Sequence, residues 1–166
     1  MKEGFGTIRI LGIDPGLETT GYGAVEMRGQ EAAVIEAGVL QTDRRVPLSE
    51  RLFRLHEELA ALLAELKPAL AAIEKLYAHY KHPRTAILMG HARGAIMLAC
   101  AQAGVKVHHF PATMVKRALT GNGHASKQQV QRAVRAICQL RELPDPPDVA
   151  DALAIALCAG RHMIKA

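Results

Sequence analysis

The chain has 166 residues, which is enough to bury one hydrophobic core and too few for two full domains, so we expect one domain over residues 1–166. With 49% hydrophobic and 22% charged residues, the composition excludes a disordered or low-complexity chain. No apolar run approaches the roughly 18 residues that cross a bilayer, and the N-terminus has no apolar signal core. We therefore expect a cytoplasmic protein without a membrane partner.

The positive charge is concentrated in the middle of the chain. Lys and Arg number 21 against 16 Asp and Glu, and from Lys75 to Arg141 there is no acidic residue, although this stretch holds 11 of the 21 basic ones. Such a segment repels itself unless an anion neutralises it, which favours polyanion binding over an ordinary solvated face. Nucleic acid is the expected polyanion. Because aromatic residues are scarce, duplex or junction backbone is favoured over a stacked single strand.

The first half of the chain reads as strands followed by a helix and a further strand. Residues 7–14, 20–27 and 32–40 are short β-branched or alternating runs separated by glycine-containing turns, which predicts three strands in a meander. Leucines at helical spacing predict a helix over residues 47–66, closed by Lys67 and Pro68. Residues 69–74 then read as a buried fourth strand.

The second half alternates helices with one more strand. We expect a helix over residues 83–103, a fifth strand over 105–110, and short helices after Pro111. Residues 126–129 fit a capping box that opens a helix running to about residue 140, and a last helix follows Pro146 and Pro147. The order predicts an α/β fold: a mixed five-stranded sheet of three meander strands and two crossover strands, with helices on both faces.

Two carboxylates lie at the ends of predicted strands. Asp14 ends the first strand beside the tight turn at Pro15 and Gly16, and Glu74 ends the fourth strand. Each has a plausible structural interpretation alone, as a turn former or as a surface charge at a strand end. Burying both among aliphatic neighbours is costly without a cation, and a hard dication turns that cost into an attraction.

A second pair of carboxylates lies at the start of the last helix. Asp148 and Asp151 are three residues apart, so both project from one side of the helix. The helix dipole favours acidic residues in any first turn, but this explains one of the two better than both, because an alanine- and leucine-rich run follows Asp151. Oxygen-only ligands on strand ends and one helix suit Mg²⁺, with Mn²⁺ as a substitute, rather than zinc.

The motifs together resemble one family. GIDPG (12–16), TGYG (20–23), AIE (72–74), GHARG (90–94), MVKRALTGNGHASK (114–127) and DVADALAIAL (148–157) are similar, in the same order, to the RuvC family of bacterial Holliday-junction resolvases. The resemblance implies a ribonuclease-H-like fold, a homodimer acting on four-way DNA junctions, and docking on a branch-migration complex. It implies that the catalytic metal ligands are Asp14, Glu74, Asp148 and Asp151.

The resemblance and the basic segment together indicate DNA contacts. Lys116 and Lys127 are implied near the scissile phosphate, although nonspecific backbone contact explains them equally well. Tyr77 matches an aromatic position that contacts a junction base. Tyr80 is the alternative, because the segment after Glu74 is about one residue longer than the family pattern. Further basic residues expected to contact DNA are Lys81, Arg84 and Arg117.

The ligand set predicts metal-assisted phosphodiester hydrolysis. Two dications about 3.5 to 4 Å apart activate the attacking water and stabilise the leaving oxygen. The family resemblance implies that this is the 3′ oxygen, so that the products carry a 5′-phosphate and a 3′-hydroxyl. Four carboxylates balance the charge of two Mg²⁺ ions. The alternatives are a YqgF-like nuclease acting on RNA, an actin-like ATPase module, for which the chain is too short, and a protein that binds junctions without cutting them.

Overall fold

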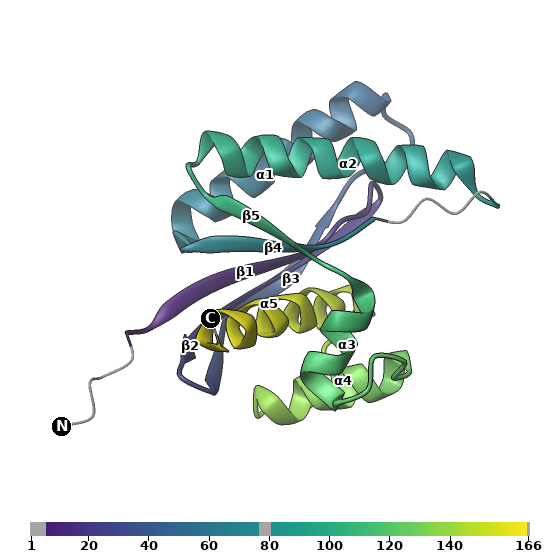
Figure 1. The fold of residues 1–166 in the computed structure, drawn as a ribbon. Helices are drawn as coiled ribbons and strands as arrows, with labels where there is room; N and C mark the ends of the chain where they lie inside the picture. Colours follow the sequence, from purple (N-terminus) through teal and green to yellow (C-terminus); the bar gives the residue numbers. More distant parts are fainter. Residues whose placement is uncertain (1–5, 77–80, 166) are drawn as a thin grey trace.

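The computed structural model of the chain describes residues 6–76 and 81–165. In this part of the chain the strands and helices follow one another in the predicted order (Figure 1). Their bounds are β1 (Ile8–Asp14), β2 (Thr19–Arg28), β3 (Glu31–Gln41), α1 (Leu48–Leu66), β4 (Leu70–Glu74), α2 (Pro83–Gln102), β5 (Lys106–Phe110), α3 (Ala112–Thr120), α4 (Lys127–Ile137) and α5 (Pro147–Lys165).

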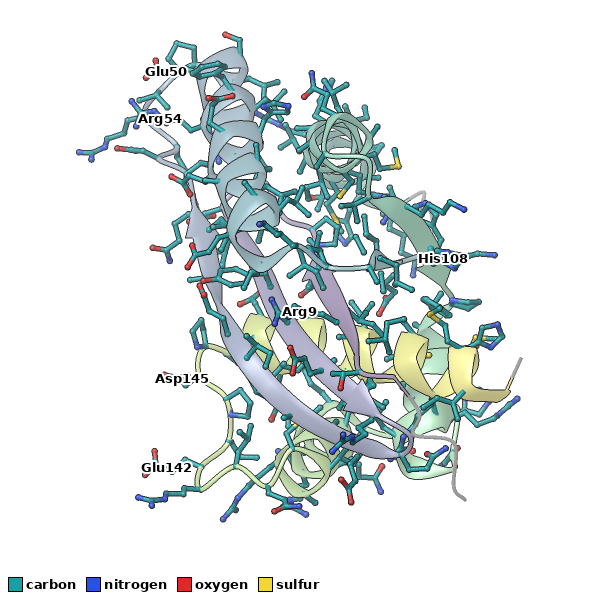
Figure 2. All side chains as sticks on the ribbon, turned by 90° about the vertical axis from the view of Figure 1, so that its left-hand side faces the viewer. Arg9, Glu50, Arg54, His108, Glu142 and Asp145 are labelled. Carbon is teal, nitrogen blue, oxygen red and sulfur yellow. The ribbon has the colours of Figure 1, made fainter. Side chains whose placement is uncertain are left out.

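The strands form one mixed sheet in the order β3-β2-β1-β4-β5. The first three strands are antiparallel to one another, whereas β4 lies parallel to β1 and β5 lies parallel to β4. The predicted meander and crossovers are therefore confirmed. At the edge formed by β5, the side chain of His108 is exposed (Figure 2).

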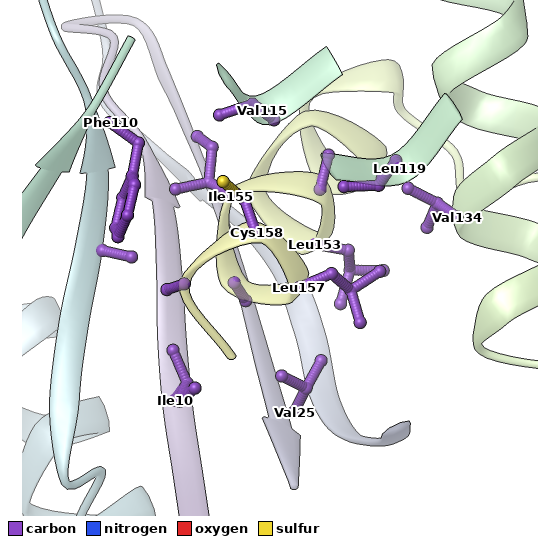
Figure 3. Close-up of a cluster of buried hydrophobic side chains, with 14 of the residues drawn as sticks. Ile10, Val25, Phe110, Val115, Leu119, Val134, Leu153, Ile155, Leu157 and Cys158 are labelled. Atoms are coloured by element: carbon purple, nitrogen blue, oxygen red, sulfur yellow. The ribbon is translucent and has the colours of Figure 1, made fainter. Parts of the chain in front are cut away.

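Helices cover both faces of the sheet, as predicted. The helices α1 and α2 pack on one face, and α3, α4 and α5 lie on the other (Figure 1). Alternation along β1 serves both faces, because Leu11 packs with α1 and α2 while Ile10 packs with α5. Figure 3 shows the hydrophobic cluster on the face covered by α3, α4 and α5, where Phe110 of β5 and Val115 of α3 lie on either side of Ile155 of α5. The helix α5 is therefore packed against the sheet.

Glycines on β1 and β2 let α5 approach the sheet closely. A Cβ atom at Gly12 would lie 2.0 Å from the carbonyl oxygen of Ala152, and one at Gly21 would lie 2.2 Å from that of Asp148. Neither position tolerates a side chain without moving the backbone of α5. The two glycines therefore fix how the start of α5 meets the end of β1.

The local signals for helix ends are mostly confirmed. Ser126 accepts a hydrogen bond from the backbone N–H of Gln129, whose side chain accepts one from the N–H of Ser126, so the predicted capping box opens α4. The expected end of this helix near residue 140 is wrong. The helix ends at Ile137 because Gln139 has a φ of 52° and turns the chain away. Within the described residues, no helix is long and apolar enough to cross a membrane.

Candidate active site

Three of the predicted carboxylates meet at one end of the sheet. Asp14 and Glu74 are the last residues of β1 and β4, and these strands are parallel neighbours paired at Ile13 and Ile73. Their carboxyl ends therefore lie side by side. Asp151 reaches the same place from the first turns of α5, which crosses this end of the sheet.

The three carboxylates line a cavity of about 250 Å³. The remaining lining residues are apolar or basic and come from α3, α4 and α5: Ala112, Val115, Lys116, Lys127, Val130 and Ala154. Asp148 lies next to this cavity, because its backbone packs on Gly21 and Gly21 pairs with Asp14 in the sheet. The four acidic residues thus occupy one region, as the sequence predicts, while their catalytic roles stay predictions.

Burial and mutual repulsion disfavour the ionised forms of Asp14 and Glu74 and so raise their pKa values. Desolvation by burial, followed by repulsion from Asp151, Asp148 and Glu74, raises the pKa of Asp14 to about 7. Burial also raises the pKa of Glu74, with Asp151 as the next cause, although the positive charges of Lys116 and Arg93 partly oppose this. The cavity therefore holds more negative charge than its surroundings stabilise.

Lys127 supplies positive charge at this site. Its Nζ atom lies 3.1 Å from Oδ2 of Asp151, and this hydrogen bond and charge raise the pKa of Lys127. Lys127 is the first residue of α4, so the capping box holds its backbone in place. Its side chain is 61% exposed and is free to exchange its partner.

The donor set fits hard divalent cations. Among the described residues it consists of carboxylate oxygens, with neither cysteine nor histidine. Oxygen atoms are the ligands that Mg²⁺ and Mn²⁺ prefer. Within residues 6–76 and 81–165, no three His, Cys, Asp or Glu side chains are arranged so that they could hold one metal ion. The carboxylates of Asp14, Glu74 and Asp151 line one cavity, and a cation beside Asp151 would replace the Lys127 ammonium there.

Arg93 is a site residue to which the sequence analysis assigned no role. Its Nη1 atom donates to the backbone carbonyl oxygen of Glu74 over 2.5 Å, and its Nη2 atom lies 2.9 Å from Nδ1 of His109. The arginine therefore ties α2 to the end of β4 and to β5. Its position in the GHARG motif and in the segment without acidic residues was the available signal.

The structure separates the predicted DNA-contact residues. Lys116 and Lys127 line the carboxylate cavity, whereas Arg117 lines a different cavity on the other side of α3. Lys81 and Arg84 are exposed near the start of α2. The predicted base contact, Tyr77, and its alternative Tyr80 lie outside the described residues.

This sheet order, with carboxylates at the ends of adjacent parallel strands, defines a ribonuclease-H-like fold. A sequence profile described as "Crossover junction endodeoxyribonuclease RuvC" matches residues 10–159. The chain therefore belongs to the RuvC family of crossover junction endodeoxyribonucleases, which are divalent-metal-dependent nucleases. Membership confirms the predicted endonuclease and sets aside the ATPase, the RNA nuclease and the non-cleaving protein.

Relatives match the chain over most of its length. The RuvC protein of Rhodopirellula baltica is 52% identical over 149 residues, which are 90% of this chain and 84% of that protein. The RuvC protein of Caldicellulosiruptor saccharolyticus is 42% identical over 152 residues, or 91% of each chain. The solved structure "T. thermophilus RuvC in complex with Holliday junction substrate" matches with a TM-score of 0.90 and 35% identity, covering 95% of this chain and 96% of that one.

Proposed function

We propose that this nuclease, acting as a single domain, resolves four-way DNA junctions by paired, symmetric hydrolysis of two phosphodiester bonds. Each cut leaves a 5′-phosphate and a 3′-hydroxyl and uses two Mg²⁺ ions, for which Mn²⁺ can substitute. The observation that carries the proposal is the meeting of Asp14, Glu74 and Asp151 in one cavity beside two lysines. The solved T. thermophilus relative is described with a Holliday junction substrate, which supports the choice of substrate.

Each group of residues has a separate task in this proposal. Bound dications supply an activated water and stabilise the charge on the leaving oxygen. Asp14, Glu74, Asp148 and Asp151 hold these ions, and their four negative charges match two divalent ions. Lys116 contacts the scissile phosphate from α3, at the wall of the same cavity.

Lys127 has two alternative partners in this scheme. Without metal it neutralises Asp151, as the 3.1 Å contact shows. When cations take over that role, the exposed ammonium becomes available to a phosphate oxygen of the DNA. Lys127 therefore offsets negative charge both in the metal-free site, on Asp151, and in the site that holds cations and DNA, on a phosphate.

The exposed face of α2 supports the predicted homodimer. Ile87 and Leu98 are 62% and 54% exposed, and Met97 lies beside Leu98. Between them, Gly90 and Gly94 have open space where a Cβ atom would lie, so a second helix can approach closely. The spacing puts these residues on one side of α2, and the opposite side packs on α1 and the sheet. A second copy of the chain matches the twofold symmetry of a junction.

The test of cleavage uses a labelled synthetic four-way junction, beside plain duplex and single strand, with and without Mg²⁺. We expect paired nicks at symmetric positions in the junction alone, and only with metal. The variant Asp14→Asn should bind the junction and fail to cut it. Asp145→Asn, which changes an exposed aspartate on the loop before α5, is the matched control and should cut normally (Figure 2). Equal nicking of duplex would refute the junction claim, and unchanged cutting by Asp14→Asn would refute the site.

The test of the dimer is the mass of the protein in solution. We expect the native chain to sediment as a dimer and Leu98→Glu to sediment as a monomer that makes uncoupled single nicks. Phe53→Glu is the matched control, because Phe53 of α1 is 63% exposed and lies off the proposed interface. A dimer that survives Leu98→Glu would place the interface elsewhere. Docking on branch-migration proteins stays a prediction of the family resemblance.

A further inference from the structure

A second cavity lies on the other side of α3 from the carboxylates. It has a volume of about 480 Å³ and is enclosed by α3, the C-terminal part of α5 and the turn between β2 and β3. Successive residues of α3 serve the two cavities, since Lys116 lines the carboxylate cavity and Arg117 lines this one. The volume falls in the range of about 300 to 1,000 Å³ that is typical of ligand pockets.

The described residues that line this cavity give it a positive charge. Arg117 and Arg161 line it together with His162, and within residues 6–76 and 81–165 no carboxylate is among its lining residues. Neither arginine forms an ion pair in the part of the chain that the structure describes. Two guanidinium groups that share a cavity repel each other unless an anion lies between them.

Arg161 is held so that one edge of its guanidinium group lacks a partner. Its Nη1 atom donates to the backbone carbonyl oxygen of Ala118 in α3. Its Nε atom is buried and has no hydrogen-bond partner within residues 6–76 and 81–165. A buried donor without an acceptor is costly and calls for an explanation. The edge of a guanidinium group formed by Nε and Nη2 can bind two oxygens of a phosphate or carboxylate at once, and because Nε is buried here, such binding requires the Arg161 side chain to turn toward the cavity that it lines.

Other lining residues add donors and an apolar wall. The side chains of Gln30 and Thr113 supply an amide and a hydroxyl group, while Met114 and Cys158 are apolar. Burial raises the pKa of Cys158 to about 11, so its thiol adds no negative charge that would repel an anion. A bare oxyanion would leave much of the 480 Å³ empty, whereas a phosphate ester also fills the apolar part.

We propose that this cavity binds a phosphate group, with Arg117 and Arg161 as its principal ligands. The phosphate belongs either to the DNA backbone or to a free phosphate or phosphate ester, and both sources present the same oxygens to the guanidinium groups. The site does not depend on the carboxylate cavity or on metal. It extends phosphate binding to a side of α3 that faces away from the proposed active site.

The test is a titration of the full-length protein with inorganic phosphate in EDTA. EDTA removes bound metal ions, through which phosphate could otherwise bind at the carboxylates, and the variants below separate the second cavity from other basic residues. Phosphate is compared with chloride at equal ionic strength, and binding is followed by the NMR signals of the arginine Nε–H groups and by the melting temperature. We expect phosphate, and not chloride, to shift the Arg161 signal and to raise the melting temperature.

Two variants and one control distinguish a specific phosphate site from nonspecific attraction by positive charge. Arg117→Ala and Arg161→Met should each weaken phosphate binding about tenfold or more. Arg117 is exposed, so its variant remains informative if Arg161→Met fails to fold. Arg141→Ala is the control, because it removes the same charge from an exposed loop that lies off this cavity, and it should bind phosphate normally.

Added junction DNA then identifies the source of the phosphate. If the site binds DNA backbone, the junction shifts the Arg161 signal itself and Arg117→Ala weakens junction binding more than Arg141→Ala does. If the site binds a free phosphate, the junction leaves the phosphate response unchanged. An Arg161 signal unmoved by both phosphate and junction would overturn the proposal, as would equal losses in Arg117→Ala and Arg141→Ala. Because Asp14→Asn keeps this site intact, failure here is distinct from failure of the nuclease assignment.

Discussion

Neutralising Asp14 is expected to stabilise the metal-free protein. Burial and three neighbouring carboxylates raise the pKa of Asp14 from 3.8 to about 7, so its negative charge opposes folding. At about 1.4 kcal/mol per pKa unit, this shift corresponds to at most about 4 kcal/mol of lost stability. Solvent and side-chain relaxation reduce such penalties, and the asparagine amide also costs energy to bury. We therefore expect Asp14→Asn to gain about 1 to 2 kcal/mol in EDTA at pH 8.

The direction of the pH dependence follows from the raised pKa. Between pH 4 and pH 7 the folded state binds the Asp14 proton more tightly than the unfolded state does, so native stability falls as the pH rises through this range. Above pH 7 the full penalty applies, and near pH 4 it vanishes. The advantage of Asp14→Asn should therefore be largest at pH 8 and close to zero at pH 4.

Urea denaturation in EDTA at pH 4, 6 and 8 measures this difference directly. Mg²⁺ at pH 8 should then stabilise the native protein more than it stabilises Asp14→Asn, because the variant has lost one proposed ligand. A variant that is less stable than the native protein at pH 8, or a gain that is the same at all three pH values, would refute the electrostatic argument. Asp145→Asn, which changes an exposed loop aspartate, should show neither effect.

Three further predictions concern Arg93, Gly21 and the buried cysteines. Arg93→Met should raise the Mg²⁺ concentration needed for half-maximal cleavage, because the carbonyl oxygen of Glu74 at the end of β4 loses its hydrogen bond. Arg93→Lys should restore part of the metal affinity. A lower cleavage rate with an unchanged metal dependence would argue against a positioning role for Arg93. Gly21→Ala should lower the free energy of unfolding, measured by urea denaturation, by about 2 kcal/mol and should also lower the cleavage rate. The reason is that its Cβ atom would lie 2.2 Å from the carbonyl oxygen of Asp148. No change in either quantity would show that α5 can shift freely. The three cysteines are buried, and burial raises the pKa of each thiol to about 11. At pH 8 they should therefore react with a disulfide reagent only after the protein unfolds. Fast labelling of the folded protein would contradict their burial.

Much of the fold could be predicted because the signals are local. Periodicity separates the meander strands from the leucine-rich helix, and the Ser126–Gln129 capping box opens α4 as predicted. That Asp14 and Glu74 share a site was predicted from their places at strand ends, and the structure supplies the reason, because β1 and β4 are parallel neighbours that end at the same edge. The end of α4 could not be predicted, since the left-handed conformation of Gln139 has no glycine signal.

The side-chain partners at the site could not be predicted, because they depend on how each helix is rotated against the sheet. Lys116 and Arg117 are adjacent in sequence but about 100° apart around α3, so they face different cavities. Their separation was foreseeable, whereas the cavity that each one lines was not. Likewise, the hydrogen bond from Arg93 to the carbonyl oxygen of Glu74 joins α2 to β4, and no sequence spacing encodes that contact.

The segregation of charge along the chain suits the proposed binding of both DNA and cations at one site. The segment without acidic residues begins directly after Glu74 and ends before Asp148, and the fold places its Lys116 and Lys127 beside carboxylates that come from outside it. In the proposed scheme, the carboxylates repel the scissile phosphate when metal is absent, while the basic residues of this segment still attract the DNA backbone. Junction binding in EDTA is therefore expected to persist and to weaken steeply with salt, whereas cleavage needs the cations that reverse the charge of the cavity.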